Sequence, residues 1–378
     1  MKPSEFTTWA TGRCSLRCKY CFVYKLYADQ PQQDFYEDKI EPLISMAINQ
    51  PKKPATIWWF GGEPTMAWDV IIKGINISKA KGLKLGQTGD LQFGLTTNLM
   101  GLNSKRAQIL GQHKFGILCS IDGIESKHDK YRKTPTGTGS WKQCWENLKQ
   151  VRKYINNNPQ IRWSIVPDTL EGISEDIAFY VKEGMTNLAC DPVYEVKWTE
   201  EDYRIYRNEM EKIRDYSIKW YRKGINLFLK PIRDGISPLT TRNRIWKSRC
   251  GLGQGGVGVD INGDIYPCHR FVSSKTCKMG NVETGIEDEA RIKWIKEWQS
   301  RPPVSEDPNK CLTCIARPAC TGGCLAVNYD VFGDVHACPT PVCELFKIQV
   351  ETFLPMYKLM EAENNLAFMN SYKGGFNS

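Results

Sequence analysis

The chain has 378 residues, of which 41% are hydrophobic, so it is long enough for one large and one smaller domain with buried cores. This composition excludes wholesale disorder. The sequence contains no run of about eighteen apolar residues, so no membrane span is expected. The formal net charge of +9 comes from scattered Lys and Arg residues, a pattern typical of a solvated surface. Residues 1–14 carry no apolar signal-peptide core, so we expect a cytoplasmic protein with no membrane or nucleic-acid partner.

Short apolar, β-branched or aromatic runs alternate with helical patterns along the first part of the chain. Strands are expected at 6–11, 55–62, 91–98, 115–123, 161–167 and 188–193. Helices are expected at 34–50, 68–82, 104–113, 140–157, 174–184 and 200–224. Six β–α units in series predict an α/β fold with a parallel sheet and helices outside. Six units are fewer than the eight of a closed barrel, so the expected form is a partial (β/α)6 barrel.

The character of the sequence changes near residues 225–245, where Pro and Gly appear. Beyond this stretch the chain is rich in Gly and Cys and only weakly periodic. Such a sequence is typical of a small fold that is organised by metal. We therefore expect a barrel over 1–235, a cysteine-rich domain over 236–364 and a polar, frayed tail over 365–378.

The fifteen cysteines are unevenly distributed. Three lie within residues 14–21 and nine lie between residues 250 and 343. Disulfides are not expected in a reducing compartment, so these two groups indicate metal or redox chemistry. The three isolated cysteines between them are expected to be buried packing residues: Cys119, Cys144 and Cys190.

Cys14, Cys18 and Cys21 follow the first predicted strand with the spacing C-x3-C-x2-C. Thiolates are the preferred ligands of iron–sulfur clusters. Three ligands on a four-iron cube leave one iron open, and an open iron can chelate a substrate. A zinc knuckle is the alternative, although zinc normally takes four ligands in another arrangement.

Polar and glycine-rich segments close the predicted strands, where a βα barrel carries its chemistry. Gly61, Gly62 and Glu63 follow the second strand. Glycines let the backbone approach a ligand closely, and a glutamate can pair with an ammonium group. An ordinary turn is the alternative. The third and fourth predicted strands end in further polar side chains: Thr96, Asn98, Ser120 and Asp122.

A second cysteine pattern lies in the C-terminal part. Its core has the spacing C-x2-C-x5-C-x3-C and consists of Cys311, Cys314, Cys320 and Cys324. Upstream, Cys250 and Cys268 bracket a segment that is typical of a β-hairpin, and Cys338 and Cys343 lie downstream. A zinc ribbon is the alternative, since its paired cysteine motifs are similar in part.

With these motifs in this order, and with Tyr20 before the third cysteine, the whole chain resembles the radical S-adenosylmethionine (SAM) superfamily with a C-terminal SPASM domain. The resemblance implies a [4Fe–4S] cluster on Cys14, Cys18 and Cys21 that binds SAM through its amino and carboxylate groups. Cleavage of SAM then yields a 5′-deoxyadenosyl radical, which abstracts a substrate hydrogen. The residues that the resemblance assigns to SAM or substrate are Gly61, Gly62, Glu63, Thr96, Asn98, Ser120, Asp122, Arg132, Ile165 and Val166.

The SPASM resemblance implies two auxiliary [4Fe–4S] clusters, which brings the expected total to three. It assigns Cys250, Cys268 and Cys324 to the first auxiliary cluster. To the second it assigns Cys311, Cys314, Cys320 and one later cysteine, with Cys343 preferred and Cys338 as the rival. The first cluster then has three cysteines, so either Cys277 is its fourth ligand or one iron is open.

The cysteine-rich segment most resembles that of radical SAM peptide maturases, which implies a thioether or carbon–carbon crosslink in a ribosomal peptide. Alternatives are an anaerobic sulfatase-maturase-like oxidation of Cys or Ser to formylglycine and a non-catalytic iron–sulfur electron carrier. Sulfatase maturases place an aspartate directly after the position of Cys268, where this chain has His269. His269 can act as a base or as a structural hydrogen-bonding residue.

The resemblance also implies partners. These are a peptide or protein substrate and a reductant such as flavodoxin or ferredoxin. Cys14 lies almost at the start of the sequence, which leaves no room for the leader-recognition domain of many peptide maturases. Leader recognition is then expected to fall to a separate protein or to the barrel itself, or not to be needed.

Overall fold

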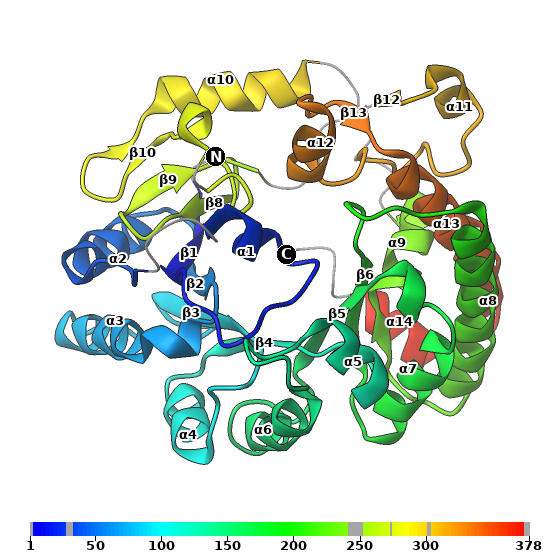
Figure 1. Cartoon of the computed structure of the whole chain (residues 1–378), viewed down its shortest axis with the longest axis horizontal. Helices are drawn as coiled ribbons and strands as arrows, with labels where there is room; N and C mark the ends of the chain where they lie inside the picture. Colours follow the sequence, from blue (N-terminus) through cyan, green and yellow to red (C-terminus); the bar gives the residue numbers. More distant parts are fainter. Residues whose placement is uncertain (1–2, 28–32, 241–251, 273, 301–303, 374–378) are drawn as a thin grey trace. The chain divides into compact units, whose positions relative to one another are not determined.

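The computed structural model describes residues 3–27, 33–240, 252–272, 274–300 and 304–373 (Figure 1). The chain divides into two compact units, and each combines segments that are distant in sequence. The first unit comprises residues 1–121, 128–159 and 251–300, and the second comprises residues 122–127, 160–250 and 301–378. None of the helices in the described ranges is both long enough and apolar enough to span a bilayer.

The first unit contains the first four predicted strands, which are parallel and adjacent in chain order. They are β1 (Glu5–Thr11), β2 (Ala55–Gly61), β3 (Leu91–Thr97) and β4 (Gly116–Ser120). The helices between and after them are α2 (Ile40–Ile48), α3 (Trp68–Ala80), α4 (Ser104–Gln112) and α6 (Trp141–Tyr154). Figure 1 shows α2, α3 and α4 outside strands β1 to β3, so the first four predicted β–α units are confirmed.

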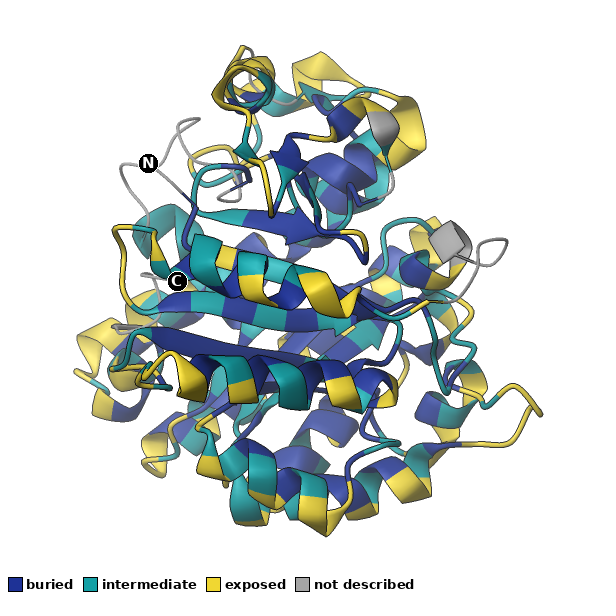
Figure 2. Cartoon of the chain, turned by 90° about the vertical axis from the view of Figure 1, so that its left-hand side faces the viewer, coloured by how far each residue is buried: buried dark blue, intermediate teal, exposed yellow. Residues whose placement is uncertain are grey.

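Side chains on β2 alternate between two faces, as a strand requires. Trp59 is fully buried on the helix side and lies against Gly74 of α3. Trp58 faces the opposite side, where its Nε1 donates a hydrogen bond to Thr96 Oγ1 at 2.7 Å. Gly94 lies opposite Trp58 on the neighbouring strand, and its missing side chain leaves room for the indole. Figure 2 shows the resulting pattern of buried strands behind helices with exposed outer faces.

A C-terminal hairpin extends this sheet beyond β1. Strand β8 (Gly256–Val259) pairs parallel with β1, and β9 (Asp264–Tyr266) returns antiparallel to it. Asp260 closes the turn, because its Oδ1 accepts hydrogen bonds from the backbone N–H groups of Asn262 and Asp264 at 2.9 Å each. Gly263 has φ +79° there, a conformation that favours glycine. The hairpin predicted before Cys268 is thus confirmed, and it continues into β10 (Gly280–Asn281), β11 (Gly285–Ile286) and α10 (Asp288–Gln299).

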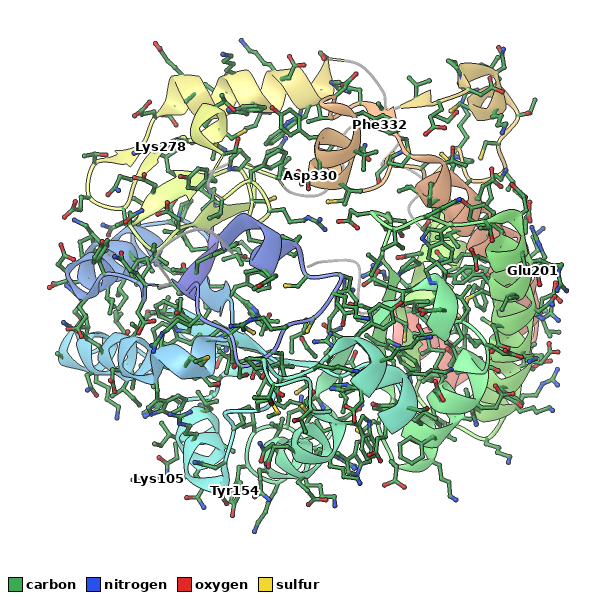
Figure 3. All side chains as sticks on the ribbon, in the orientation of Figure 1. Lys105, Tyr154, Glu201, Lys278, Asp330 and Phe332 are labelled. Atoms are coloured by element: carbon green, nitrogen blue, oxygen red, sulfur yellow. The ribbon has the colours of Figure 1, made fainter. Side chains whose placement is uncertain are left out.

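The second unit contains the last two predicted β–α units. Its parallel strands are β5 (Gln160–Ile165), β6 (Asn187–Pro192) and the short β7 (Phe228–Leu229). Helix α7 (Ile173–Lys182) joins β5 to β6, and α8 (Glu200–Arg222) follows β6. A capping box starts α8, because the side chains of Thr199 and Asp202 each accept the other's backbone N–H. Glu201 in the first turn of α8 projects outward (Figure 3).

Helix α13 (Thr340–Ala362) packs against α8 and α9 (Lys230–Thr240) within this unit. Gly235 permits the close approach of α9, since a Cβ there would lie 2.4 Å from the carbonyl oxygen of Gln349. The Gln349 side chain donates a buried hydrogen bond to Tyr206 at 2.7 Å. The remaining described helices and strands are α1 (Phe22–Tyr27), α5 (Glu125–Tyr131), α11 (Pro308–Leu312), α12 (Leu325–Phe332), α14 (Leu366–Lys373), β12 (Val304–Ser305) and β13 (Ala337–Cys338).

One expectation about the C-terminal half needs correction. The Pro- and Gly-containing stretch near 225–245 includes α9, with Pro231 in its first turn, where no proline N–H is needed, and Pro238 inside the helix. The prediction of a frayed tail is wrong for residues 366–373, which form α14. Phe368 of this helix is fully buried against Tyr221 and Tyr357, and this burial holds the tail in place.

The fit between Trp58 and Gly94 predicts the effect of one added methyl group. An alanine Cβ at position 94 would lie 1.9 Å from Trp58 Cε3, so the rigid indole must move. We expect Gly94→Ala to lower the free energy of unfolding by about 1–3 kcal/mol. Gly256→Ala is the matched control, because its Cβ would meet its nearest atom, Glu5 O, at 3.7 Å. Equal midpoints of chemical denaturation for the two variants would contradict this packing.

Candidate functional site

Three loops that follow β1, β2 and β3 meet within the first unit. The backbone N–H of Gly62 donates to Thr11 O at 2.8 Å, and that of Glu63 donates to Arg13 O at 2.7 Å. A Cβ at position 62 would lie 2.0 Å from Arg13 O, so only glycine allows this approach. Gly61 has φ +112°, which also favours glycine. The two glycines thus hold the segment after β2 against the loop that carries Cys14.

The carboxylate of Glu63 is the centre of this junction and is only 1% exposed. Its Oε1 accepts hydrogen bonds from Thr65 N at 3.1 Å, Thr65 Oγ1 at 2.6 Å and Thr97 Oγ1 at 2.8 Å. Its Oε2 accepts from Asn98 N at 2.7 Å. Burial raises the pKa of Glu63, and these hydrogen bonds oppose that effect. Each oxygen faces a backbone N–H, so the arrangement fits the ionised carboxylate.

Asn98 connects Glu63 to the first cysteine motif. Its Nδ2 lies 3.1 Å from Ser15 Oγ and 3.7 Å from Cys14 Sγ, to both of which it donates. The backbone N–H of Leu16 also donates to Cys14 Sγ, at 3.4 Å. Burial raises the pKa of Cys14 to about 12, with the Leu16 hydrogen bond opposing. Burial disfavours the charged thiolate of Cys14. A bound metal would remove the thiol proton and compensate the negative charge.

Cys18 and Cys21 are half-buried and lie on one turn, where the backbone N–H of Cys21 donates to Cys18 O at 3.0 Å. Among the residues that the structure describes, no three Cys, His, Asp or Glu side chains are grouped closely enough for a single metal ion. An iron–sulfur cluster distributes its ligands over separate iron atoms, and thiolates are its usual ligands. The donor chemistry of Cys14, Cys18 and Cys21 therefore fits such a cluster.

The other residues predicted to contact SAM fall in both units. In the first, Arg132 is buried with its guanidinium 5.6 Å from the ring centroid of Tyr20, and Ser120 ends β4. Thr96 is half-buried and accepts the Trp58 hydrogen bond. In the second unit, Asp122 accepts a hydrogen bond from Ser164 N at 2.9 Å. Ile165 and Val166 of that unit are buried at the end of β5.

His269 lies in an aromatic environment that the sequence did not reveal. Its ring centroid is 4.8 Å from that of Phe60 on β2 and 6.1 Å from that of Phe22 on α1. The guanidinium of Arg270 covers the Phe22 ring at 4.3 Å. Phe60 directly precedes Gly61. Its position next to the glycine motif was the sequence signal that could have indicated an aromatic residue near the site. The hairpin thus places His269 beside β2, and the loop after β2 carries Glu63.

The cysteines of the first unit differ in burial. Cys268 is half-buried, and Gly258 lets β8 pass close to it, since a Cβ there would lie 2.5 Å from the carbonyl carbon of Cys268. Cys277 is fully buried and accepts a hydrogen bond from Ser274 Oγ at 3.2 Å. Cys250 lies outside the described residues. Cys119 and Cys144, with Cys190 in the second unit, are buried as expected of packing residues.

The second unit gathers several C-terminal cysteines. Backbone N–H groups of Ser305 and Gly322 donate to Cys311 Sγ and Cys320 Sγ, respectively, both at 3.4 Å. Burial raises the pKa of Cys320 to about 11, and the neighbouring thiols of Cys343, Cys314 and Cys311 add to this effect. These four predicted ligands of one cluster all belong to the second unit. Cys324 is half-buried in the same unit and precedes α12.

Comparison with known sequences finds a match to one family model and several relatives. Residues 10–178 match the model of the Radical SAM superfamily. The cysteine-type anaerobic sulfatase-maturating enzyme of Clostridium novyi is 24% identical over 335 residues, which cover 83% of this chain and 86% of that protein. The radical SAM cyclopropyl synthase TigE of Paramaledivibacter caminithermalis is 22% identical, over 94% of this chain and 74% of that protein.

Solved structures show the same fold. Native anSMEcpe with bound AdoMet superposes with a TM-score of 0.78 and 18% identity, covering 96% of this chain and all of the other. Streptococcus suis SuiB bound to its precursor peptide SuiA superposes with a TM-score of 0.62 and 18% identity, covering 90% of this chain and 76% of that one. The α/β fold with a parallel sheet, typical of the partial barrel of these proteins, is thereby confirmed, together with its cysteine-rich C-terminal region.

The Glu63 junction predicts the effect of removing one charge. A glutamine at position 63 sets its NH2 group against a backbone N–H in either orientation, Thr65 N in one and Asn98 N in the other. We expect Glu63→Gln to lower the free energy of unfolding by about 1–3 kcal/mol, measured by chemical denaturation. The control is Glu37→Gln, which removes an exposed ion pair with Lys73 and should change stability by less than about 1 kcal/mol. Equal stability of the two variants would mean that Glu63 does not hold the loops.

Proposed function

We propose that the chain is a radical SAM enzyme that crosslinks a ribosomal peptide by abstracting a hydrogen atom from one of its side chains. The bond formed is a thioether or a carbon–carbon bond. The observation that carries the proposal is the junction of the loops after β1, β2 and β3. There, Cys14 lies beside Asn98, and Glu63 holds Asn98 in place.

The superfamily works with a [4Fe–4S] cluster and SAM. In our proposal, Cys14, Cys18 and Cys21 hold the cluster at their thiolates. When bound, the cluster supplies the electron that cleaves SAM and yields the hydrogen-abstracting radical. The side chain of Glu63 is occupied by Thr65, Thr97 and Asn98, so it acts by positioning these loops and by its negative charge near the SAM ammonium group. The further residues proposed to bind SAM are Gly61, Gly62, Thr96, Asn98, Ser120, Asp122, Arg132, Ile165 and Val166.

Two auxiliary [4Fe–4S] clusters complete the proposal. The gathering of Cys311, Cys314, Cys320 and Cys343 in the second unit supports one of them. Hydrogen bonds from Ser305 N and Gly322 N to two of these sulfurs are of the kind that tunes cluster potentials. For the other, we propose Cys250, Cys268 and Cys324, with Cys277 as a fourth ligand or with an open iron.

The proposed substrate class is a peptide. Structures of anSMEcpe with the Cp18Cys peptide and of SuiB with SuiA show that proteins of this fold bind peptides. His269 is the proposed base for a substrate proton. Its ring centroid lies 4.8 Å from that of Phe60 and 6.1 Å from that of Phe22, which places the imidazole beside β2 and α1. A flavodoxin or ferredoxin is the proposed reductant, and a separate leader-binding protein is a further proposed partner.

Formylglycine formation is the second candidate. The agreement in length with anSMEcpe, where each chain covers at least 96% of the other, favours it. The similarity to the Clostridium novyi maturase, over more than four fifths of each chain, points the same way. Against it stands His269, which occupies the position directly after Cys268.

Removal of the first cysteine motif tests the SAM chemistry. We expect Cys14→Ala, Cys18→Ala and Cys21→Ala, combined in one variant, to abolish 5′-deoxyadenosine formation from SAM with dithionite. The reconstituted variant should contain about four irons fewer than the wild type, which should hold about twelve. The control combines Cys119→Ala and Cys190→Ala, and it should keep its iron because these buried thiols are not predicted ligands. Wild-type levels of 5′-deoxyadenosine in the first variant would rule out this cluster as the reductant of SAM.

The product distinguishes the two candidate functions. We expect a small precursor peptide encoded beside the gene to lose a pair of hydrogen atoms when it is incubated with the reconstituted enzyme, SAM and dithionite, because a crosslink replaces two X–H bonds. Mass spectrometry measures the loss, and a hydrazide reagent detects aldehydes. An aldehyde at a Cys or Ser residue would instead establish formylglycine formation and contradict the crosslinking proposal.

A further inference from the structure

Five cysteines surround the place where the second auxiliary cluster needs four ligands. Cys311, Cys314 and Cys320 supply three thiols. Cys338 Sγ lies 3.5 Å from Cys343 Sγ, and Cys338 pairs with Ser305, whose backbone N–H donates to Cys311 Sγ at 3.4 Å. All five cysteines lie within the second unit. A cluster with four cysteine ligands therefore needs only one of Cys338 and Cys343.

The two candidate sulfurs for the fourth position are close neighbours. Cys338 Sγ and Cys343 Sγ are 3.5 Å apart. Two thiolate sulfurs on one tetrahedral metal with bonds of about 2.3 Å lie roughly 3.8 Å apart. With a sulfur–sulfur separation near this value, a metal atom bonded to one of the two sulfurs would lie close to the other.

Each cysteine is held by a different element. Cys338 ends β13, in which it pairs with Ser305 of β12. The backbone N–H of Ser305 donates to Cys311 Sγ, so β12 fixes Cys338 relative to a proposed ligand of the cluster. Cys343 lies in the first turn of α13, and its backbone N–H donates to Pro339 O at 3.4 Å. The two sulfurs therefore reach one another from rigid supports.

The surroundings of the two sulfurs are unequal. Cys338 is 1% exposed. Cys343 is half-buried and lines a surface cavity of about 160 Å³ together with Glu306, Thr340 and Glu344. Small reagents can therefore reach Cys343 from solvent, whereas Cys338 is protected.

We propose that Cys338 and Cys343 are interchangeable ligands of one iron of the second auxiliary cluster, with Cys338 as the protected reserve. This inference rests on the proposed function, which places a cluster on Cys311, Cys314 and Cys320. In the exchange, Cys338 gives up its proton and binds the iron, while Cys343 leaves the iron and takes up a proton. The number of bound thiolates and the oxidation state are unchanged, so no oxidant or reductant is needed.

Iron content of reconstituted full-length variants tests the exchange. Cys338→Ala and Cys343→Ala should each keep the wild-type iron content, since the remaining cysteine takes the fourth position. The double variant and Cys320→Ala should each lose about four irons. Cys190→Ala, which removes a buried cysteine elsewhere in the same unit, is the matched control and should lose none.

The outcomes separate this inference from the proposed function. If Cys343→Ala or Cys338→Ala alone loses about four irons, as Cys320→Ala does, the cluster exists and the exchange is refuted. If neither Cys320→Ala nor the double variant loses iron, the cluster itself is absent and both proposals fail.

Labelling of the wild-type protein tests the exchange without any variant, so the result does not depend on whether a variant folds. We expect N-ethylmaleimide to label Cys343 of the anaerobic holoenzyme slowly, with no loss of iron, because Cys338 takes over when Cys343 leaves. Peptide mapping locates the label. Labelling that removes about four irons, or complete protection of Cys343, would overturn the proposal.

Discussion

The buried carboxylate of Glu63 is the interaction on which the candidate site depends. An ionised carboxylate without partners is very costly to bury, so its position is stable only when donors surround it. Here the donors come from its own loop and from the end of β3, and the adjoining backbone N–H groups bind the loop after β1. One side chain thus fixes the distances among three loops that start on different strands. Gly61 and Gly62 make this possible, because side chains at these positions would prevent the close approach.

The C-terminal cysteine-rich segment contributes to both units. Its hairpin adds to the first sheet by pairing with β1, and this brings Cys268 and His269 to the strand that ends in Gly61. Its later part, with Cys311 and Cys343, belongs to the second unit, where α13 packs on α8 and α9.

Local patterns in the sequence were sufficient for the six β–α units and the hairpin before Cys268. Period-2 burial on β2 and the Thr199 cap of α8 are examples of signals that depend only on neighbouring residues. Contacts between distant segments carried no such signal. The burial of Phe368 depends on Tyr221, and the environment of His269 depends on Phe22 and Phe60. The proximity of Cys338 to Cys343 likewise depends on how β13 joins α13, which spacing alone does not determine.

The most direct test of the central claim is whether SAM binds to the open iron of the cluster proposed on Cys14, Cys18 and Cys21. The dithionite-reduced protein can be measured by low-temperature electron paramagnetic resonance with and without SAM, and by electron–nuclear double resonance with SAM labelled at its amino nitrogen. The account predicts that SAM changes the spectrum of the reduced cluster and that the labelled nitrogen shows a hyperfine coupling to it. A spectrum that is unchanged by saturating SAM, with no coupling to the labelled nitrogen, would contradict the account.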